Sequence, residues 1–442
     1  MEQNLLTYLK PSSGGWNCTT KSSIPHPMGW NSAHGKAAPG CLKILSLKKA
    51  TEMRILLGLD PLRPPLTGIG SYTKHLAEEL IRMPDLEVGG YGFGNIFSPE
   101  KMIKLLSATY LLQNKSATGQ DHIKNRLREI PGAYALLKTL MHRSMKQKLE
   151  HSNLKFLCHA PDFILPRSSG RNVVTIHDLS HLKYPETHPP ARVKWLKKML
   201  PETLRRASGI ITVSEYIRKE LLESGLIPDG KPVYAIPNGC SAGFHPRNRD
   251  MVLPTLAKYK LGWRRFILGV GTLEPRKNPS GLVEAYLKLP DEVTESFPLI
   301  LVGVKGWKNQ QLNKILSHVT PVKNIHLTGY LPEKEVQELT ASAAVFVYPS
   351  LYEGFGLPVL EAMASGTAVL TSNRGALAEL GEKGAMLVNP EKPSAISKSM
   401  EIMLTDPEEN RKWQKAGRKK AALYSWKKCA TMTSDVYRMV NG

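Results

Sequence analysis

The densest group of residues that could do chemistry lies at 349–366, reading Pro-Ser-Leu-Tyr-Glu-Gly-Phe-Gly-Leu-Pro-Val-Leu-Glu-Ala-Met-Ala-Ser-Gly. Glu353 follows an apolar run that is typical of a strand, and Pro358 suits the first turn of a helix. The amides of Gly356 and Leu357 would then point from a helix N-terminus, where the dipole favours an anion. The segment therefore predicts a phosphate site.

Two carboxylates, Glu353 and Glu361, flank this turn with the spacing E-x7-E. On a ligand that carries a diphosphate between two sugars, amides bind the phosphate and carboxylates accept hydrogen bonds from vicinal hydroxyls. Neither group needs a metal. A structural alternative stays open, because an acidic residue in a first turn also stabilises its own helix N-terminus, and Glu361 could do only that.

A second cluster, 269–277, reads Gly-Val-Gly-Thr-Leu-Glu-Pro-Arg-Lys directly after another apolar run. Arg276 and Lys277 could meet a diphosphate and stabilise charge that develops on a phosphate leaving group. Taken alone, the segment is more typical of a solvated basic turn. Beside the first cluster, the ligand interpretation is the stronger one.

A third cluster, Thr-Gly-Ile-Gly-Ser-Tyr at 67–72, opens a predicted amphipathic helix. Gly68 and Gly70 are similar to the start of a dinucleotide fingerprint, but Thr73 stands where the third glycine would be. A nicotinamide site is thus weakly supported. A glycine-rich turn that touches a ligand fits better.

The fourth candidate is His177, which ends an apolar run and precedes Asp178. A histidine there could pass a proton or hydrogen-bond a hydroxyl near neutral pH. A structural histidine is an equal alternative.

The elements that must position these clusters form an alternating strand and helix pattern from Met53 onward, the signature of βαβ units. In the first half, strands are predicted at 54–59, 88–93, 155–159, Asn172–Ile176, 209–213 and 232–236. In the second half, they are predicted at 266–270, 299–303, 324–327, 344–348, 368–371 and 385–388. We expect an α/β protein of two Rossmann-like, doubly wound parallel-sheet domains that face each other across a cleft, where open α/β sheets bind ligands.

The 442 residues carry 60 Lys+Arg against 38 Asp+Glu, a formal net charge of +22, which favours anionic partners: nucleic acid, anionic lipid or phosphate-bearing small molecules. The five cysteines form no CxxC pair, so neither a zinc knuckle nor a disulfide framework is expected. P-loop, HExxH, GxSxG and DxD motifs do not occur, and no apolar run approaches the ~20 residues of a membrane span.

Two segments stand apart from this pattern. Residues 1–52 are rich in Ser, Gly, Pro and Lys without a hydrophobic period, so we expect a disordered extension, either a genuine tail or sequence ahead of a natural start near Met53. Residues 101–150 hold ten Lys/Arg against three Asp/Glu. A basic amphipathic helix at 133–149 would suit an anionic membrane face, and helices packed on the first domain are the alternative.

The segment from Glu353 to Gly366 closely resembles the E-x7-E motif of retaining GT-B glycosyltransferases of family 4 (glycosyl transferases group 1), which include bacterial polysaccharide mannosyltransferases. Further motifs resemble the family in order along the chain: 67–72, 175–186, 212–215, 236–239, 271–278 and 372–376. The resemblance implies a GT-B fold. It places an acceptor-side domain at 53–245 and a donor-binding domain at 246–423, with a helix at about 424–442 that packs back on the first domain.

Carried over residue by residue, the resemblance implies roles for the clusters above. The implied catalytic residues are Glu353, His177 and Lys277, and the acceptor-side residues are His177 and Asp178. The implied donor-binding residues are Gly68, Gly70, Thr272, Arg276, Lys277, Gly356, Leu357 and Glu361. Many relatives carry a basic residue where this chain has Thr272, so the phosphate contact would rest more on Arg276 and Lys277.

The implied reaction moves a sugar, mannose by similarity, from a nucleoside diphosphate sugar to a hydroxyl of a glycan or lipid-linked acceptor with retention, in cell-surface polysaccharide synthesis. No cofactor, metal or nucleic acid is expected. The expected location is the cytoplasm, with peripheral contact at the inner face of the membrane. Two rivals stay open: a non-catalytic nucleotide-sugar or glycan-binding protein of the same fold, and a nucleic-acid binder, which the charge alone suggests.

Overall fold

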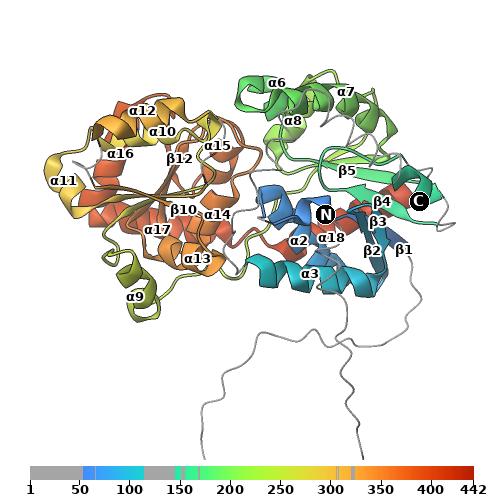
Figure 1. Cartoon of the computed structure of the whole chain (residues 1–442), viewed down its shortest axis with the longest axis horizontal. Helices are drawn as coiled ribbons and strands as arrows, with labels where there is room; N and C mark the ends of the chain where they lie inside the picture. The colour runs from blue at the N-terminus through green and yellow to red at the C-terminus, as the bar shows by residue number, and fades with distance from the viewer. Residues whose placement is uncertain are drawn as a thin grey trace, which may run out of the picture. The chain divides into compact units, whose positions relative to one another are not determined.

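The computed structural model describes residues 53–64, 66–113, 145–150, 155–167, 170–304, 306, 308–319 and 324–442. The extension predicted at 1–52 and the part of the predicted basic helix before residue 145 lie outside the described residues. The described chain forms two sheets, each of which has helices packed against it (Figure 1).

The first sheet has seven strands in the order β3-β2-β1-β4-β5-β6-β7. All neighbours are parallel except β2 and β3, which are antiparallel. The strands are β1 (Met53–Gly58), β2 (Leu86–Gly92), β3 (Asn95–Phe97), β4 (Leu157–Ala160), β5 (Asn172–Ile176), β6 (Gly209–Thr212) and β7 (Val233–Ala235). Every residue of β4, β5 and β6 is buried, as expected for a parallel sheet covered on both faces.

The second sheet has six strands in the order β10-β9-β8-β11-β12-β13, and all of its neighbours are parallel. The strands are β8 (Ile267–Val270), β9 (Leu299–Val302), β10 (Ile325–Gly329), β11 (Val345–Tyr348), β12 (Ala368–Ser372) and β13 (Met386–Val388). In chain order this is the 3-2-1-4-5-6 arrangement of a doubly wound fold.

The strands predicted from hydrophobic runs are all present, and no predicted end differs from the observed one by more than two residues. The strand β3 was not predicted; it has only three residues and lies antiparallel at the edge of the first sheet. The predicted domain boundary at 245 and 246 falls between β7 and β8.

The helices lie along these strands in the alternation expected of βαβ units (Figure 1). Those of the first half are α2 (Gly68–Ile81), α3 (Pro99–Gln113), α6 (Ser180–Lys183), α7 (Pro190–Arg206) and α8 (Glu215–Glu223), with the 3-10 turns η1 (Asp60–Leu62) and η2 (Pro185–Thr187). Those of the second are α9 (Arg249–Lys258), η3 (Pro275–Lys277), α10 (Pro279–Tyr286), α11 (Asp291–Ser296), α12 (Gln310–Val319), α13 (Glu333–Ser342), α14 (Leu357–Ala364), α15 (Gly375–Gly381), α16 (Pro393–Thr405) and α17 (Pro407–Ala421).

The last helix, α18 (Trp426–Asn441), returns from the second sheet and lies beside α2 of the first (Figure 1). Its buried residues Trp426 and Tyr437 belong to the same hydrophobic core as Tyr72 of α2. The Tyr437 hydroxyl lies 2.6 Å from Nδ1 of the fully buried His159 on β4. The end of the chain is therefore part of the first domain's core.

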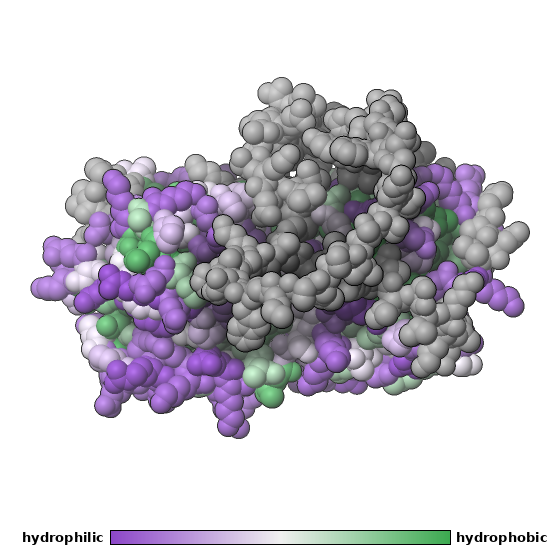
Figure 2. Space-filling view, turned by 90° about the horizontal axis from the view of Figure 1, so that it is seen from below, coloured by the Kyte–Doolittle hydropathy of each residue, from purple (hydrophilic) through white to green (hydrophobic). Residues whose placement is uncertain are grey.

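The surface gives no sign of a membrane-spanning element within the described residues. None of the helices described is both long and apolar enough to cross a bilayer. Figure 2 shows one face of the molecule, on which the coloured residues are mainly hydrophilic and the hydrophobic areas are small. Scattered apolar areas of this size are ordinary on a folded protein.

Candidate functional site

Two of the clusters predicted from the sequence meet where the strand order of the second sheet reverses. The strands β8 and β11 are neighbours there, although β9 and β10 separate them in the chain. The basic loop, residues 271–277, follows β8, and the acidic loop, residues 349–356, follows β11. Open α/β sheets bind ligands outside the carboxyl ends of the strands at such a point.

Asn278 joins these two loops. It has a left-handed backbone (φ 55°) and caps α10 by accepting from the Gly281 amide at 3.1 Å. Its side-chain amide donates to the carbonyls of Pro349 (3.2 Å) and Pro390 (2.7 Å). The end of the basic loop is thereby fixed to the start of the acidic loop.

Glu353 is the centre of the site. Its Oε2 accepts from Arg276 Nη1 at 3.0 Å, and its Oε1 lies 3.3 Å from Lys277 Nζ. The hydroxyls of Tyr348 and Ser350 also donate to Oε1, at 2.9 and 3.2 Å. The side chain of Glu353 is only 12% exposed, so these interactions occur largely away from water.

The charges of this cluster fix its protonation. Burial raises the pKa of Glu353, but the positive charges of Arg276 and Lys277 outweigh that effect and bring the pKa to about 2. Burial likewise lowers the pKa of Lys277, and the charge of Glu353 more than offsets it, so this pKa lies above its ordinary value. At neutral pH the site holds one ionised carboxylate between two cations.

The two cations differ in how far a ligand can reach them. Arg276 is buried, and its guanidinium donates to the Tyr352 carbonyl (2.6 Å), to Glu353 and to Glu274 (2.8 Å). Lys277 Nζ donates to the Tyr348 hydroxyl at 2.7 Å and lies beside Glu353. An ammonium has three N–H donors, so Lys277 keeps one for a ligand. Arg276 also keeps donors, including a buried Nε without a partner among the described residues, but its side chain is less exposed than that of Lys277 (10% against 19%), so Lys277 is the better phosphate candidate of the pair.

The acidic loop ends in the predicted helix N-terminus. Gly356 has φ 106°, a backbone conformation that glycine adopts without strain, and α14 follows with Pro358 in its first turn. The carbonyl of Gly356 accepts from the amides of Val359 (3.0 Å) and Leu360 (3.1 Å). The amides of Gly356 and Leu357 have no acceptor among the described residues, so both can donate to an anion.

Glu361 lies half-buried on α14 and forms no hydrogen bond or ion pair within the described part of the chain. Burial, and then the nearby charge of Glu333, raise the pKa of its carboxyl to about 8. A carboxyl without a protein partner has its oxygens available to ligand hydroxyls. The structural alternative, a carboxylate in the first turn that stabilises its own helix N-terminus, is wrong, because α14 begins at Leu357 and has no acidic residue in its first turn.

The acceptor-side candidates lie on the histidine loop, residues 177–180 after β5. His177 is buried, and its Nε2 lies 2.7 Å from the Pro161 carbonyl, which can only accept, so Nε2 carries a proton. Burial lowers the pKa of the ring, so Nδ1 is its unprotonated atom near neutral pH. Asp178 accepts at Oδ1 from the amide (2.9 Å) and hydroxyl (2.6 Å) of Ser180.

The pKa of Asp178 also depends on a charged residue of the second domain. Burial raises the pKa of its carboxyl, but the charge of Arg276 and the bonds from Ser180 lower it below its ordinary value. The backbone is closer still, because a Cβ added to Gly354 would lie 1.7 Å from the His177 carbonyl oxygen. The acidic loop and the histidine loop are therefore in direct contact.

Three predicted donor residues lie apart from this network. Gly68 is exposed at the start of α2, with open space where a side chain would be, and Gly70 is packed against the Pro61 carbonyl. Thr272 is exposed on the basic loop. None of the three forms a hydrogen bond or ion pair with the Glu353 cluster among the described residues.

Several residues of the network were not predicted from the sequence. Tyr348 and Ser350 bind Glu353 directly, and their signal was available, since both lie at the carboxyl end of a predicted strand. Tyr352 bonds to Glu220 on α8, which lies 132 residues away in the chain. No local pattern indicates that pair.

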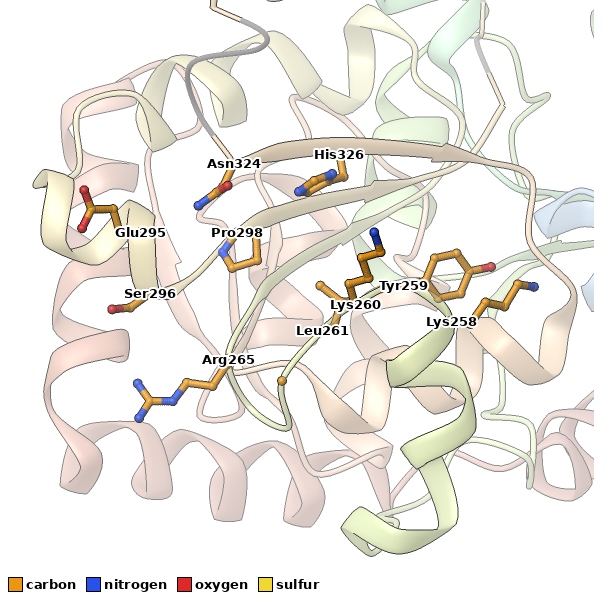
Figure 3. A pocket seen from close by; sticks show the side chains of 11 residues that line it. Lys258, Tyr259, Lys260, Leu261, Arg265, Glu295, Ser296, Pro298, Asn324 and His326 are labelled. Atoms are coloured by element: carbon orange, nitrogen blue, oxygen red, sulfur yellow. The ribbon is translucent and has the colours of Figure 1, made fainter.

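A separate cavity of about 650 Å³ lies at the amino ends of strands in the second sheet (Figure 3). Its lining includes Arg265, Pro298 and Asn324, which precede β8, β9 and β10. It contains none of the predicted site residues. Across the described residues, no group of three or more His, Cys, Asp or Glu could hold a metal ion.

Comparisons with known proteins identify the family of the chain. The sequence model of the glycosyl transferases group 1 matches residues 258–420, and that of glycosyltransferase family 4 matches residues 66–243. The chain is 33% identical over 388 residues to O-antigen chain mannosyltransferase B of Escherichia coli, covering 88% of this chain and 100% of that protein.

Solved structures share the fold. Sucrose-phosphate synthase of Thermosynechococcus elongatus has a TM-score of 0.64 at 21% identity, covering 88% of this chain and 99% of that one. HepE of Anabaena in complex with UDP and glucose has a TM-score of 0.62 at 15% identity, covering 87% and 99%. The two α/β domains have the GT-B glycosyltransferase fold. The chain belongs to the family 4 glycosyltransferases, with its second half in group 1.

Proposed function

We propose that this glycosyltransferase moves mannose from a nucleoside diphosphate sugar to a hydroxyl of a glycan or lipid-linked acceptor, in the synthesis of a cell-surface polysaccharide. The observation that carries the proposal is the buried cluster of Glu353, Arg276 and Lys277 beside the free amides of α14. The similarity to a protein named O-antigen chain mannosyltransferase B supports mannose as the sugar and a polysaccharide as the product.

The donor would bind across the loops of the second sheet. The remaining N–H of Lys277 and the amides of Gly356 and Leu357 would bind the diphosphate. Glu361 would accept hydrogen bonds from the ribose, and Glu353 from hydroxyls of the transferred sugar. Arg276 keeps Glu353 ionised, and so ready to accept, at every physiological pH.

The first domain would complete the donor site and hold the acceptor. The turn at Gly68 and Gly70, of which Gly68 is exposed, would line the diphosphate from α2, and Thr272 would lie on the donor side of the basic loop. His177 would offer Nδ1 to an acceptor hydroxyl, with the carboxylate of Asp178 beside it.

We propose retention at the anomeric carbon through a front-face path. The acceptor oxygen bonds to the anomeric carbon as the bond to the diphosphate oxygen breaks, and the acceptor proton passes to the departing phosphate. The protein holds the stabilising groups in position before the reaction starts. Lys277 and the helix amides stabilise the leaving diphosphate, and Glu353 stabilises positive charge on the sugar. The same groups would make a divalent ion unnecessary.

A test of the proposal measures binding first and turnover second. Thermal shift against a panel of nucleoside diphosphate sugars should select GDP-mannose, since a ligand at 100 times its dissociation constant adds about 2.7 kcal/mol to the stability of the folded state. NMR of the product should then show retained anomeric configuration, and EDTA should leave the rate unchanged. No response to any member of the panel overturns the proposal.

The roles of the charged residues are tested by substitution. Lys277→Ala and Glu353→Ala should each raise the barrier by about 2 to 4 kcal/mol, as removal of a donor aimed at developing charge does. The measurement is kcat/KM with a fixed acceptor. Turnover near the wild-type value in both variants contradicts these roles.

We also propose cytoplasmic catalysis with peripheral contact at an anionic membrane face. The described residues support this on α7, where Lys194, Lys197 and Lys198 are exposed on one helical face without a carboxylate partner among the described residues. Reversing these three charges should abolish salt-sensitive binding to vesicles that contain anionic lipid. The matched control reverses three exposed cations of α17: Arg411, Lys415 and Lys419. Equal binding of both variants contradicts a role for α7.

A further inference from the structure

Tyr352 belongs to the second domain, but its side chain is buried in the core of the first domain. It directly precedes Glu353 on the acidic loop of the second sheet, yet its side chain packs in the hydrophobic cluster of α6, α7 and α8. Only 7% of the residue is exposed, and its ring lies 5.4 Å from that of Tyr184 and 6.5 Å from that of Tyr216. This burial fixes where the acidic loop meets the first domain.

The hydroxyl of Tyr352 has two partners, and both belong to the first domain. It accepts from the amide of Leu179 at 2.9 Å and donates to a carboxylate oxygen of Glu220 on α8. Glu220 is itself buried, with the Tyr216 hydroxyl at 3.4 Å and Lys183 Nζ at 3.7 Å. A buried hydroxyl with both bonds satisfied holds one geometry, since losing either bond leaves a buried polar group unpaired.

The partner amide belongs to the histidine loop. Leu179 follows Asp178 directly, so Tyr352 holds the segment on which both acceptor-side candidates lie. Gly354 holds the same segment from the other side: the His177 carbonyl fills the space of its missing side chain, and its own carbonyl accepts from Ser214 Oγ at 2.7 Å.

Arg276 connects Tyr352 to the donor site. One nitrogen of its guanidinium, Nη1, donates both to the Tyr352 carbonyl (2.6 Å) and to the Glu353 carboxylate (3.0 Å). The contacts therefore run without a break from Glu220 through Tyr352 and Arg276 to Glu353.

We propose that Tyr352 is a positioning residue that sets the histidine loop against Glu353, so that an acceptor hydroxyl, rather than water, meets the sugar bound at Glu353. This inference rests on the proposed function. Tyr352 touches neither substrate, and its effect is on the geometry between the two binding sites. Its loss should therefore change how the bound donor is used more than how tightly the donor binds.

The central variant is Tyr352→Phe, which keeps the ring and removes the hydroxyl. Donor affinity should stay within about twofold of the wild type, while the ratio of transfer to donor hydrolysis should fall about tenfold or more, as loss of a hydrogen bond to a charged group allows. The acceptor KM should rise. The matched control is Tyr216→Phe, which removes a neighbouring hydroxyl from the same carboxylate and leaves Leu179 untouched, so its ratio should match the wild type.

Substitutions of Glu220 give the same comparison from the partner's side. Glu220→Gln keeps an oxygen that accepts from Tyr352 and should retain most of the wild-type ratio, whereas Glu220→Leu should behave like Tyr352→Phe. Should Tyr352→Phe fold poorly, this pair decides the question alone.

The results for the variants test the positioning role of Tyr352, and those for the wild type test the proposed function. A wild-type transfer ratio in both Tyr352→Phe and Glu220→Leu overturns the positioning role, as does a parallel loss of donor affinity and transfer, which marks a merely structural residue. A wild type that neither binds nor hydrolyses any nucleotide sugar overturns the proposed function itself.

Discussion

Replacing Glu353 with Gln tests the electrostatics of the site most sharply. Gln is nearly isosteric and can still accept from Tyr348, so the substitution removes the charge and little else. In the folded protein burial raises the pKa of Glu353, and the adjacent cations lower it from its ordinary 4.5 to about 2. That change corresponds to about 3 kcal/mol in favour of the ionised, folded form at neutral pH.

Breaking a buried ion pair from one side gives a similar figure, about 3 to 5 kcal/mol. Both arguments predict that Glu353→Gln lowers the free energy of unfolding by about 3 kcal/mol at pH 7. Because the folded-state pKa lies below the unfolded one, this stabilisation is complete above pH 4.5 and is lost as the pH falls through about 2. The difference between variant and wild type should halve near about pH 3.

The assay is urea unfolding followed by tryptophan fluorescence and far-UV circular dichroism, with coincident transitions required before one free energy is assigned. The control is Glu391→Gln, which removes an exposed carboxylate from its pair with Arg374 and should leave the midpoint unchanged. A difference below about 1 kcal/mol for Glu353→Gln at pH 7, the size of a surface pair, refutes the reasoning. So does a difference that stays the same at pH 3.

Three further predictions follow from single contacts. Gly354→Ala places a Cβ on the His177 carbonyl, so transfer should fall about 100-fold or more in a rate assay, as a displacement of about 1 Å permits; wild-type turnover contradicts the contact. Glu361→Gln should raise the melting temperature much more at pH 9 than at pH 4, because burial, and then a neighbouring charge, raise the pKa of the carboxyl from its ordinary 4.5 to about 8, and the wild type loses stability as the pH rises from 4.5 to about 8; a pH-independent change is the contrary result. Tyr437→Phe leaves Nδ1 of buried His159 without its partner and should lower the free energy of unfolding by about 1 to 3 kcal/mol in urea; no loss would place α18 outside the core.

The fold was readable from the sequence because its strands are buried on both faces. Such strands are continuous apolar runs, as at Asn172–Ile176 and Val345–Tyr348, and each predicted run became a strand. The edge strand Asn95–Phe97 was not predicted, because three residues are too few to show a hydrophobic pattern.

The candidate site was readable only in part. Glu353, Arg276 and Lys277 follow strands, and the topology of a parallel sheet brings such loops to one edge, so their meeting follows from the predicted elements. The side-chain partners of Glu353 depend on how each loop closes, which spacing does not specify. The bond from Tyr352 to Glu220 depends on how the two domains pack together. Glu220 lies on α8 among other charged residues, and the sequence pattern does not distinguish it as the buried carboxylate.

Calorimetric titration of a nucleoside diphosphate into the wild type and Lys277→Ala, in EDTA, measures the central claim most directly. The account predicts binding without a metal and an affinity about 10 to 150 times weaker in the variant, the value of one hydrogen bond to a charged group. Equal affinity in the two proteins, or binding that EDTA abolishes, would contradict a diphosphate site built on Lys277 and the α14 amides.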